Sequence, residues 1–345
     1  MGIIGRHSFE LCSRPRIISS ASYVGDKEGK GPLRECFDKI CRDDTLGLDS
    51  WEQAESRMFE SAVRVALAKI KRQSDDLSCL LGGDLLNQII SSGFAAREIR
   101  APFIGLYGAC STISEGLMLG GMLVDGGFAE LAACAASSHF SAAERQFRYP
   151  LEMGVQAVPS SQRTVTGAGS IIIQAAGEFR PGAGNVFEHV ALTGGTIGSV
   201  EDFGITDANN MGAAMAPAAF KTIKAHLSDY SRRVEDYDRI ITGDLGIFGS
   251  DMLYELLRGE GIEIADRHED CGKLMFSTEQ NVNCGASGCG CAATVMSSWF
   301  LPKIESGEIR RVLFLATGAL MSPVSSLQGE SIPSIAHAVV IEHID

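Results

Sequence analysis

The fold is decided by the stretch Gly105-Leu106-Tyr107-Gly108-Ala109-Cys110-Ser111-Thr112-Ile113-Ser114-Glu115-Gly116-Leu117. An apolar run over 102–107 predicts a buried strand, and the small and apolar residues of 112–123 predict a helix. Cys110 therefore lies between a strand and the first turn of a helix. Because a helix N-terminus is partly positive, it favours the thiolate form and makes Cys110 a candidate nucleophile. A buried apolar cysteine is the alternative, which position alone leaves open.

Composition limits the classes of protein to which the chain can belong. Its 345 residues are 45% hydrophobic, enough for a large core in one big domain or two fused ones. A formal net charge of −13 argues against nucleic acid as a partner and against a basic membrane-binding face. Charge follows Met1 too early for a signal peptide, no apolar run reaches about 18 residues, and the cysteines are dispersed. These features predict a soluble protein of a reducing compartment.

The first half of the chain alternates predicted strands and helices. Strands are predicted over 16–24, 78–82, 130–136 and 164–173. Ser50 has the capping-box spacing that begins a helix ending near residue 72. A polar loop is expected after residue 136, and it holds His139, Arg145 and Arg148.

The second half repeats this order at offsets of about 160 to 180 residues, which indicates an internal duplication. Residues 234–246 (VEDYDRIITGDLG) parallel residues 74–86 (SDDLSCLLGGDLL), so that Asp244 corresponds to Asp84. Duplicated β-α-β units predict mixed sheets that are buried between helices. We therefore expect an α/β chain of two halves, 1–185 and 186–345, packed as one unit.

Six short blocks of the sequence carry a family resemblance, namely LGGDLLNQ at 81–88, YGACST at 107–112, SSHFSAAERQFR at 137–148, TVTGAG at 164–169, TGDLG at 242–246 and SGCGC at 287–291. In this order they resemble the thiolase superfamily and, more closely, the stage V sporulation protein AD family of spore-forming bacteria. The resemblance implies a thiolase-like five-layered α-β-α-β-α fold and a homodimer. It also implies binding of dipicolinic acid (pyridine-2,6-dicarboxylate) and support of its uptake into the developing forespore during sporulation.

Condensing enzymes of this superfamily attack an acyl thioester with a Cys that is assisted by His and Asn, or by two His. The segment that matches the first partner holds Asp244 and no His, and the segment of the second, 284–287, holds no Asn. Asn281 and Asn283 lie close enough for a shifted alignment to supply the second partner. Since a carboxylate beside a thiol favours the neutral thiol, we hypothesise that Cys110 lines a pocket and that acyl transfer has been lost. A ketoacyl-synthase-like condensing enzyme that uses Cys110 as its nucleophile is the alternative.

A pocket for dipicolinate needs partners for two carboxylates, a ring nitrogen and a flat aromatic face. Arginine binds carboxylates through two hydrogen bonds, so Arg145 and Arg148 are candidates, with His139 beside them. Asp84 and Asp244 would repel the free dianion but would suit its calcium chelate, and their ordinary role is to cap helices. The full set of predicted ligand-binding residues is Cys110, His139, Asp244, Asp84, Arg145, Arg148 and Ser287.

No cofactor and no resident metal is predicted. Cys284, Cys289 and Cys291 lack a CxxC pair, and residues 166–170 lack the third glycine of a dinucleotide fingerprint and the lysine of a P-loop. Because uptake into a spore needs a membrane route that this chain does not provide, we expect it to dock on membrane proteins of the same sporulation uptake complex. It would then be cytoplasmic and peripherally associated with the inner membrane of the forespore.

Overall fold

The chain is organised around one hydrogen-bonded sheet, seen in a computed structural model that describes residues 2–147 and 158–345. The main strands of the first half are β3 (Arg16–Val24), β5 (Cys79–Gly83), β6 (Phe103–Gly105), β7 (Leu131–Ser138) and β9 (Gly167–Gln174). Those of the second half are β10 (Val190–Thr196), β11 (Arg239–Thr242), β12 (His268–Asp270), β14 (Arg311–Ala319) and β15 (Ser334–His343).

The two halves have the same strand order. The order β6-β5-β7-β9-β3 of the first half is repeated as β12-β11-β14-β15-β10 in the second. In each half the first three strands are parallel and the other two are antiparallel to their neighbours. In the sheet the halves meet at β10, which pairs with β3 through Ala191 and Arg16 and with β2 (Ser8–Glu10) along Gly194–Thr196. The predicted duplication with mixed sheets is confirmed, and the boundary at residue 185 stays a prediction.

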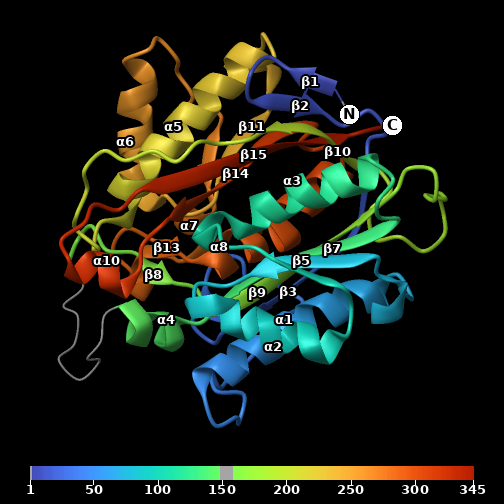
Figure 1. The fold of residues 1–345 in the computed structure, drawn as a ribbon, viewed down its shortest axis with the longest axis horizontal. Coiled ribbons are helices and arrows are strands. Elements are labelled where there is room, and N and C mark those ends of the chain that lie inside the picture. The colour runs from blue at the N-terminus through green and yellow to red at the C-terminus, as the bar shows by residue number, and fades with distance from the viewer. Residues whose placement is uncertain (1, 148–157) are drawn as a thin grey trace.

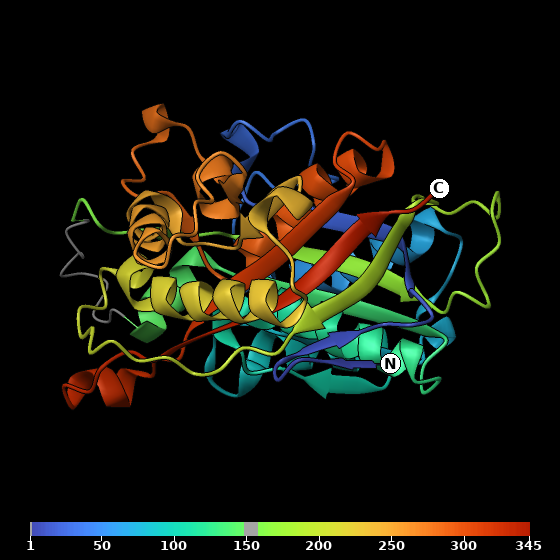
Figure 2. The same ribbon diagram turned by 90° about the horizontal axis from the view of Figure 1, so that it is seen from above.

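Helices cover both faces of each half of the sheet. α1 (Trp51–Lys69) and α2 (Ile90–Ile99) lie outside the first half, and α5 (Met211–Asp229) and α6 (Gly246–Arg258) lie outside the second (Figure 1). Between the halves lie α3 (Thr112–Asp125) and α8 (Cys289–Val295). Seen from above, α5 lies across the long strands β14 and β15 (Figure 2). This is the predicted five-layered α-β-α-β-α arrangement of the thiolase-like fold.

Shorter elements complete the chain. The remaining helices are α4 (Phe140–Phe147), α7 (Cys271–Met275), α9 (Leu301–Glu305) and α10 (Pro323–Leu327). The remaining strands are β1 (Gly2–Ile4), β2 (Ser8–Glu10), β4 (Lys39–Ile40), β8 (Arg163–Thr164) and β13 (Ala286–Ser287). Strands β8 and β13 pair in parallel and form a small sheet of their own.

Local sequence explains the layers. The Ser50 hydroxyl accepts a hydrogen bond from the Gln53 backbone N–H and caps α1, as its spacing predicts. Every residue of β7 (LAACAASS) is buried, because the strand is covered by α1 on one face and by α3 on the other. A β-carbon at Gly120 of α3 would lie 2.9 Å from the Cys134 sulfur of β7. Small residues therefore allow the central helix to approach the sheet closely.

Three local predictions are wrong. The expected polar loop after β7 is mostly the helix α4, whose buried Ala142 and Ala143 turn toward the core. The strand expected over 164–173 is broken, because residues 163–164 pair with β13 and only Gly167–Gln174 enter the main sheet. The strand at 103–105 is the edge strand β6, and Ile104 is 41% exposed rather than buried.

Candidate functional site

Cys110 lies in a single 3-10 turn, Ala109–Ser111, between β6 and α3. Ala109 has a φ of 50°, a value that residues other than glycine rarely adopt, so the chain turns sharply just before the cysteine. Cys110 is buried, and its side chain lines a cavity. The predicted position of Cys110 between a strand and a helix is confirmed.

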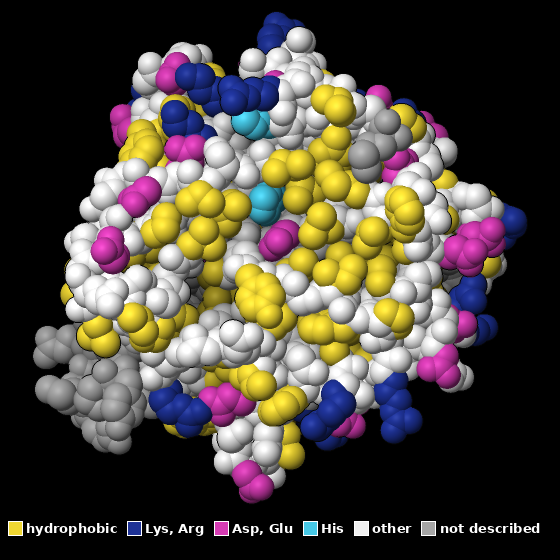
Figure 3. Space-filling model, in the orientation of Figure 1, with side chains coloured by type: hydrophobic (Ala, Val, Ile, Leu, Met, Phe, Trp, Pro, Cys, Tyr) yellow, Lys and Arg dark blue, Asp and Glu magenta, His cyan; other side chains and the backbone are white. Residues whose placement is uncertain are grey.

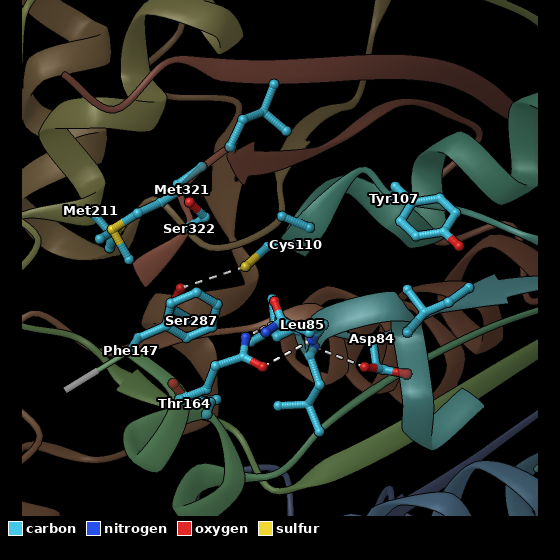
Figure 4. Close-up of a pocket in the computed structure, with 18 of the residues that line it drawn as sticks. Asp84, Leu85, Tyr107, Cys110, Phe147, Thr164, Met211, Ser287, Met321 and Ser322 are labelled. Carbon is cyan, nitrogen blue, oxygen red and sulfur yellow. Dashed lines mark hydrogen bonds between the residues drawn. The ribbon is translucent and has the colours of Figure 1, made fainter. Parts of the chain in front are cut away.

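The cavity at Cys110 has a volume of about 420 Å³, within the range of small-molecule sites. In Figure 4 the sulfur of Cys110 points toward Ser287, and Met211, Phe147 and Thr164 surround the same space. The walls combine thioether, aromatic and hydroxyl groups with two carboxylates, those of Asp84 and Glu144. No Lys, Arg or His lines this cavity in the described part of the chain. We call it the Cys110 cavity.

Three side chains behind Cys110 form a chain of hydrogen bonds. The Ser287 hydroxyl lies 4.0 Å from the Cys110 sulfur and donates to Oδ2 of Asp244 over 3.0 Å. The same Asp244 carboxylate accepts from the Thr317 hydroxyl at 2.7 Å and from the Gly288 N–H at 3.2 Å. Because the Ser287 hydroxyl donates its hydrogen bond to Asp244, it has only lone pairs to offer the Cys110 thiol.

The thiol of Cys110 is held in its neutral form. A hydrogen bond with Cys289, burial, and the negative charge of Asp244 raise the pKa of Cys110 well above its ordinary value. Burial also raises the pKa of Asp244, while hydrogen bonds from Thr317, Cys110 and Ser287 act in the opposite direction. The site therefore offers a neutral thiol and a hydroxyl acceptor, and the described residues place no imidazole against them to take the thiol proton.

Asp84 lines the cavity, but its oxygens serve the backbone. Oδ1 accepts from the Leu86 N–H at 2.8 Å, and Oδ2 accepts from the N–H and the hydroxyl of Ser92, with 2.8 Å to the N–H. These bonds hold the turn that leads into α2, which is the capping role that is ordinary for an aspartate there. Burial raises the pKa of Asp84. Asp244 has no such role, since Asp270 accepts from the N–H groups of Leu245 and Gly246 at the start of α6.

Of the predicted cationic partners, His139 and Arg145 do not line the Cys110 cavity. His139 is buried, and its Nε2 lies 2.9 Å from the backbone oxygen of Asp44. Burial lowers the pKa of His139, so its ring is neutral at pH 7. Arg145 bonds the carboxylate of Glu52 and lies over the ring of Trp51, 5.2 Å from its centroid. Arg148 lies outside the described residues.

Sequence reasoning missed several lining residues, namely Tyr107, Phe147, Met211 and the segment 319–325. Tyr107 follows β6 and residues 319–325 follow β14, so both stand at carboxyl ends of strands in the parallel parts of the sheet. Ligands of α/β folds gather at these ends, so the ends of the predicted strands were the signal that could have found these residues. Asn281 and Asn283, proposed as a rescue of the catalytic Asn, are exposed and do not line the Cys110 cavity.

The clustered cysteines of the second half have local partners. The Cys289 sulfur donates to the Ala109 oxygen at 2.9 Å, and the Cys284 sulfur donates to the Pro159 oxygen at 3.1 Å. Within residues 2–147 and 158–345 no three His, Cys, Asp or Glu side chains are arranged to hold a metal ion. All ten cysteines are free thiols.

Comparison with known proteins identifies the family. The family model of Stage V sporulation protein AD (SpoVAD) matches residues 5–342. The chain belongs to the SpoVAD family. It is 43% identical to Stage V sporulation protein AD of Bacillus subtilis (strain 168) over 343 residues, which are 99% of this chain and 98% of that protein.

Solved structures similar to this SpoVAD-family chain have the thiolase fold. OleA of Xanthomonas campestris, solved with cerulenin, aligns over 98% of both chains with a TM-score of 0.59 at 14% identity. Human mitochondrial 3-ketoacyl-CoA thiolase, solved with CoA, aligns over 98% of this chain and 100% of its own with a TM-score of 0.59 at 10% identity. The 3-oxoacyl-[acyl-carrier-protein] synthase III of Aquifex aeolicus VF5 aligns over 95% of this chain and 100% of its own chain, with a TM-score of 0.55 at 12% identity. At these identities the likeness establishes the fold alone.

Across residues 2–147 and 158–345, no helix has both the length and the hydropathy that crossing a bilayer requires.

Proposed function

We propose that this chain binds dipicolinic acid, free or as its calcium chelate, in the Cys110 cavity and supports its uptake into the developing forespore. Membership of the Stage V sporulation protein AD family supports a role in sporulation. The observation that carries the proposal is the protonated thiol of Cys110 beside Ser287 and Asp244, in a cavity that no described histidine lines. Such a cavity is suited to holding a ligand rather than to attacking one.

The charges of the lining favour the chelate over the free dianion. The described lining holds the carboxylates of Asp84 and Glu144 and no cationic side chain. Two carboxylates of a free ligand would meet like charge there, whereas calcium neutralises them before they enter. The thioethers of Met211 and Met215 and the ring of Phe147 supply apolar contacts for a flat aromatic ring.

Calorimetric titration tests the proposal. Dipicolinate is titrated with and without Ca²⁺ into the wild type, Cys110→Ala and Met211→Trp, the last of which places a large ring in the cavity. We expect wild type and Cys110→Ala to bind, with the chelate bound more tightly than the dianion. Met211→Trp should lose binding at an unchanged melting temperature. Equal binding by Met211→Trp and wild type would contradict the proposal that dipicolinate binds in the Cys110 cavity.

An acyl-thioester condensing enzyme is the second candidate, because Cys110 stands at the start of a central helix in a fold shared with thiolase and synthase III structures. It would need a group that takes the proton of Cys110, and the carboxylate whose charge acts on this thiol, Asp244, is already bonded to Ser287 and Thr317. Incubation with an acyl-CoA followed by mass spectrometry of the Cys110 peptide separates the candidates. A stoichiometric acyl adduct would favour the enzyme.

We further propose that two copies associate through β6. This strand is the last in the sheet order, and it carries Ile104 at 41% exposure next to Tyr107 at 63%. The face that carries α3 toward the viewer in Figure 1 has its hydrophobic side chains in the middle and most of its charged ones near the margin (Figure 3). Sedimentation should give a dimer for wild type and for the exposed control Leu327→Lys, and a monomer for Ile104→Lys.

The uptake role also requires a route across the membrane, and we propose that membrane proteins of the same sporulation complex provide it. The expected result is loss of dipicolinate loading in spores that lack those proteins while this chain is still made. Normal loading in such spores would contradict the proposal.

A further inference from the structure

A second cavity lies beside the small β8–β13 sheet. Ala286 of β13 pairs with Arg163 of β8, and Ser287 pairs with Thr164. Thr164 and Ser287 line the Cys110 cavity, whereas Arg163 lines a separate cavity of about 130 Å³. Successive side chains of a strand point to opposite faces, so Arg163 and Thr164 face different spaces, and Glu144 lines both of them. We call the second space the Arg163 cavity.

The guanidinium of Arg163 is charged, and its hydrogen-bonding edge is free. It lies 3.6 Å above the centroid of the Phe140 ring, which fixes its plane. Its Nε is buried without a hydrogen-bond partner, and no ion pair or hydrogen bond of this guanidinium is found among the described residues. The carboxylates of Glu28, Asp44 and Glu144 attract it through space. A guanidinium stacked by its face presents its in-plane N–H groups, which match a planar carboxylate.

A residue with a buried acceptor lines the same cavity. Gln162 is 8% exposed, and its Nε2 donates to the backbone oxygens of Asp244 and Ala286 at 2.6 and 2.9 Å. Those two bonds fix the orientation of the amide, and they leave its buried Oε1 without a partner. A buried acceptor without a donor costs free energy, so a ligand that donates a hydrogen bond here would be stabilised.

The lining charges set the charge of the ligand. In the described lining the cations are Lys27 and Arg163, the carboxylate is Glu144, and the other polar residues are neutral amides and a hydroxyl. Because Glu28 and Asp44 also act on Arg163 from outside the lining, the excess of positive charge at the cavity is small. This balance suits a monoanion better than a dianion such as dipicolinate.

We propose that the Arg163 cavity binds a small monocarboxylate that carries a hydrogen-bond donor, such as a hydroxy acid. The carboxylate accepts from Arg163 and Lys27, and the donor reaches Oε1 of Gln162. This site does not depend on what the Cys110 cavity binds.

Lactate serves as the probe, with binding followed by saturation-transfer NMR and calorimetry on the full chain. Arg163→Gln should weaken lactate binding at least about tenfold, because a charge-assisted hydrogen-bonded pair is lost. Asn281→Asp changes only an exposed residue of the lining and adds negative charge, so it should weaken binding severalfold without risk to the fold. Arg145→Gln, whose partner is Glu52, is the matched control and should bind as wild type does.

Two further measurements distinguish this site from the Cys110 cavity and from a phosphate-binding site. Met211→Trp should leave lactate binding unchanged even where it abolishes dipicolinate binding, so the two proposals fail separately. Unchanged lactate affinity in both Arg163→Gln and Asn281→Asp would overturn the site. Loss of lactate binding in Met211→Trp, or binding of inorganic phosphate without lactate, would overturn it as well.

Discussion

The two halves of the chain treat the same aspartate in different ways. Asp84 and Asp244 are 160 residues apart, and each follows the equivalent strand, β5 or β11. Asp84 bonds the backbone of its own half at Leu86 and Ser92. Asp244 instead bonds Ser287 and Thr317, beside Cys110 of the other half, and Asp270 holds the start of α6 in its place.

Two positions near these aspartates, one in a helix and one in a strand, also differ between the halves. Glu55 of α1 is buried against Asp84, and the equivalent residue of α5, at an offset of 160, is Met215. The Ser137 hydroxyl of β7 donates to Glu55 at 3.0 Å, whereas Thr317, its equivalent in β14, donates to Asp244. The second half has the apolar Met215 where the first half has Glu55, so Thr317 bonds Asp244 where Ser137 bonds the glutamate. Of the two equivalent aspartates, one therefore caps its own half and the other bonds side chains behind Cys110.

The largest expected effect comes from Asp270→Ala, which removes the substitute cap of the second half. It would remove the acceptor of four donors, namely the Thr242 hydroxyl and the N–H groups of Leu245, Gly246 and Lys273, of which only Thr242 keeps a second partner, His268. Unsatisfied buried donors cost about 1–3 kcal/mol each, so we expect the free energy of unfolding to fall by roughly 4 kcal/mol. Urea unfolding measures it. Asp270→Asn keeps an acceptor oxygen and should cost clearly less; equal losses would argue against the cap.

Asp84→Ala tests the corresponding cap of the first half. Fewer groups depend on it, namely the N–H of Leu86 and both donors of Ser92, and we expect a loss of roughly 2–3 kcal/mol in the same measurement. If Asp84 were chiefly a ligand group, Asp84→Ala would lower dipicolinate affinity and leave urea unfolding almost unchanged.

A pH series compares the equivalent edge strands. His268 of β12 stands where β6 has Phe103, each paired with the equivalent residue of the neighbouring strand. Burial lowers the pKa of His268 to about 3, so the folded chain keeps this ring neutral while the unfolded chain binds a proton below about pH 6.5. Its contribution to stability is therefore complete above pH 6.5 and is lost as the pH falls toward 3.

Between pH 7 and pH 5 wild type should lose about 2 kcal/mol more than His268→Phe, since each pH unit below the unfolded pKa costs about 1.4 kcal/mol. The comparison of slopes is needed because Glu28 and Asp270, whose pKa values burial raises to about 7 and about 6, act in the opposite direction. Identical slopes in the two proteins would show that the histidine does not titrate as described.

The smallest effect is expected from Asp244→Asn. Removing this charge lowers the pKa of Cys110, but the hydrogen bond with Cys289 and burial remain, so the thiol should stay mostly neutral near pH 8. Alkylation by iodoacetamide near pH 8 should accelerate less than tenfold, with Cys110→Ala as the control for the labelled site. Rapid alkylation of wild-type Cys110 at pH 6.5 would contradict the neutral thiol.

Local and repeating features were predictable from the sequence. The cap at Ser50, the strand at 16–24 and the 160-residue offset depend on neighbouring residues or on self-comparison, and all are found. The family blocks also led to the fold and to Cys110. The directions of Arg145 and His139 were not predictable, because each is set by a contact far away in the chain, with Glu52 and with Asp44. Segment 319–325 carries no motif, and it reaches the cavity only because β14 ends there.

Burial, which helps to keep the thiol of Cys110 protonated, has the same effect on most of the other cysteines. Burial raises the pKa of Cys79, Cys134, Cys271 and Cys291, and it raises that of Cys41 to about 12. Peroxides and disulfides react with thiolates, so these sulfurs are slow to oxidise. Cys12 alone is exposed, and thiol oxidation of this protein should therefore begin near its amino-terminal end and reach Cys110 late.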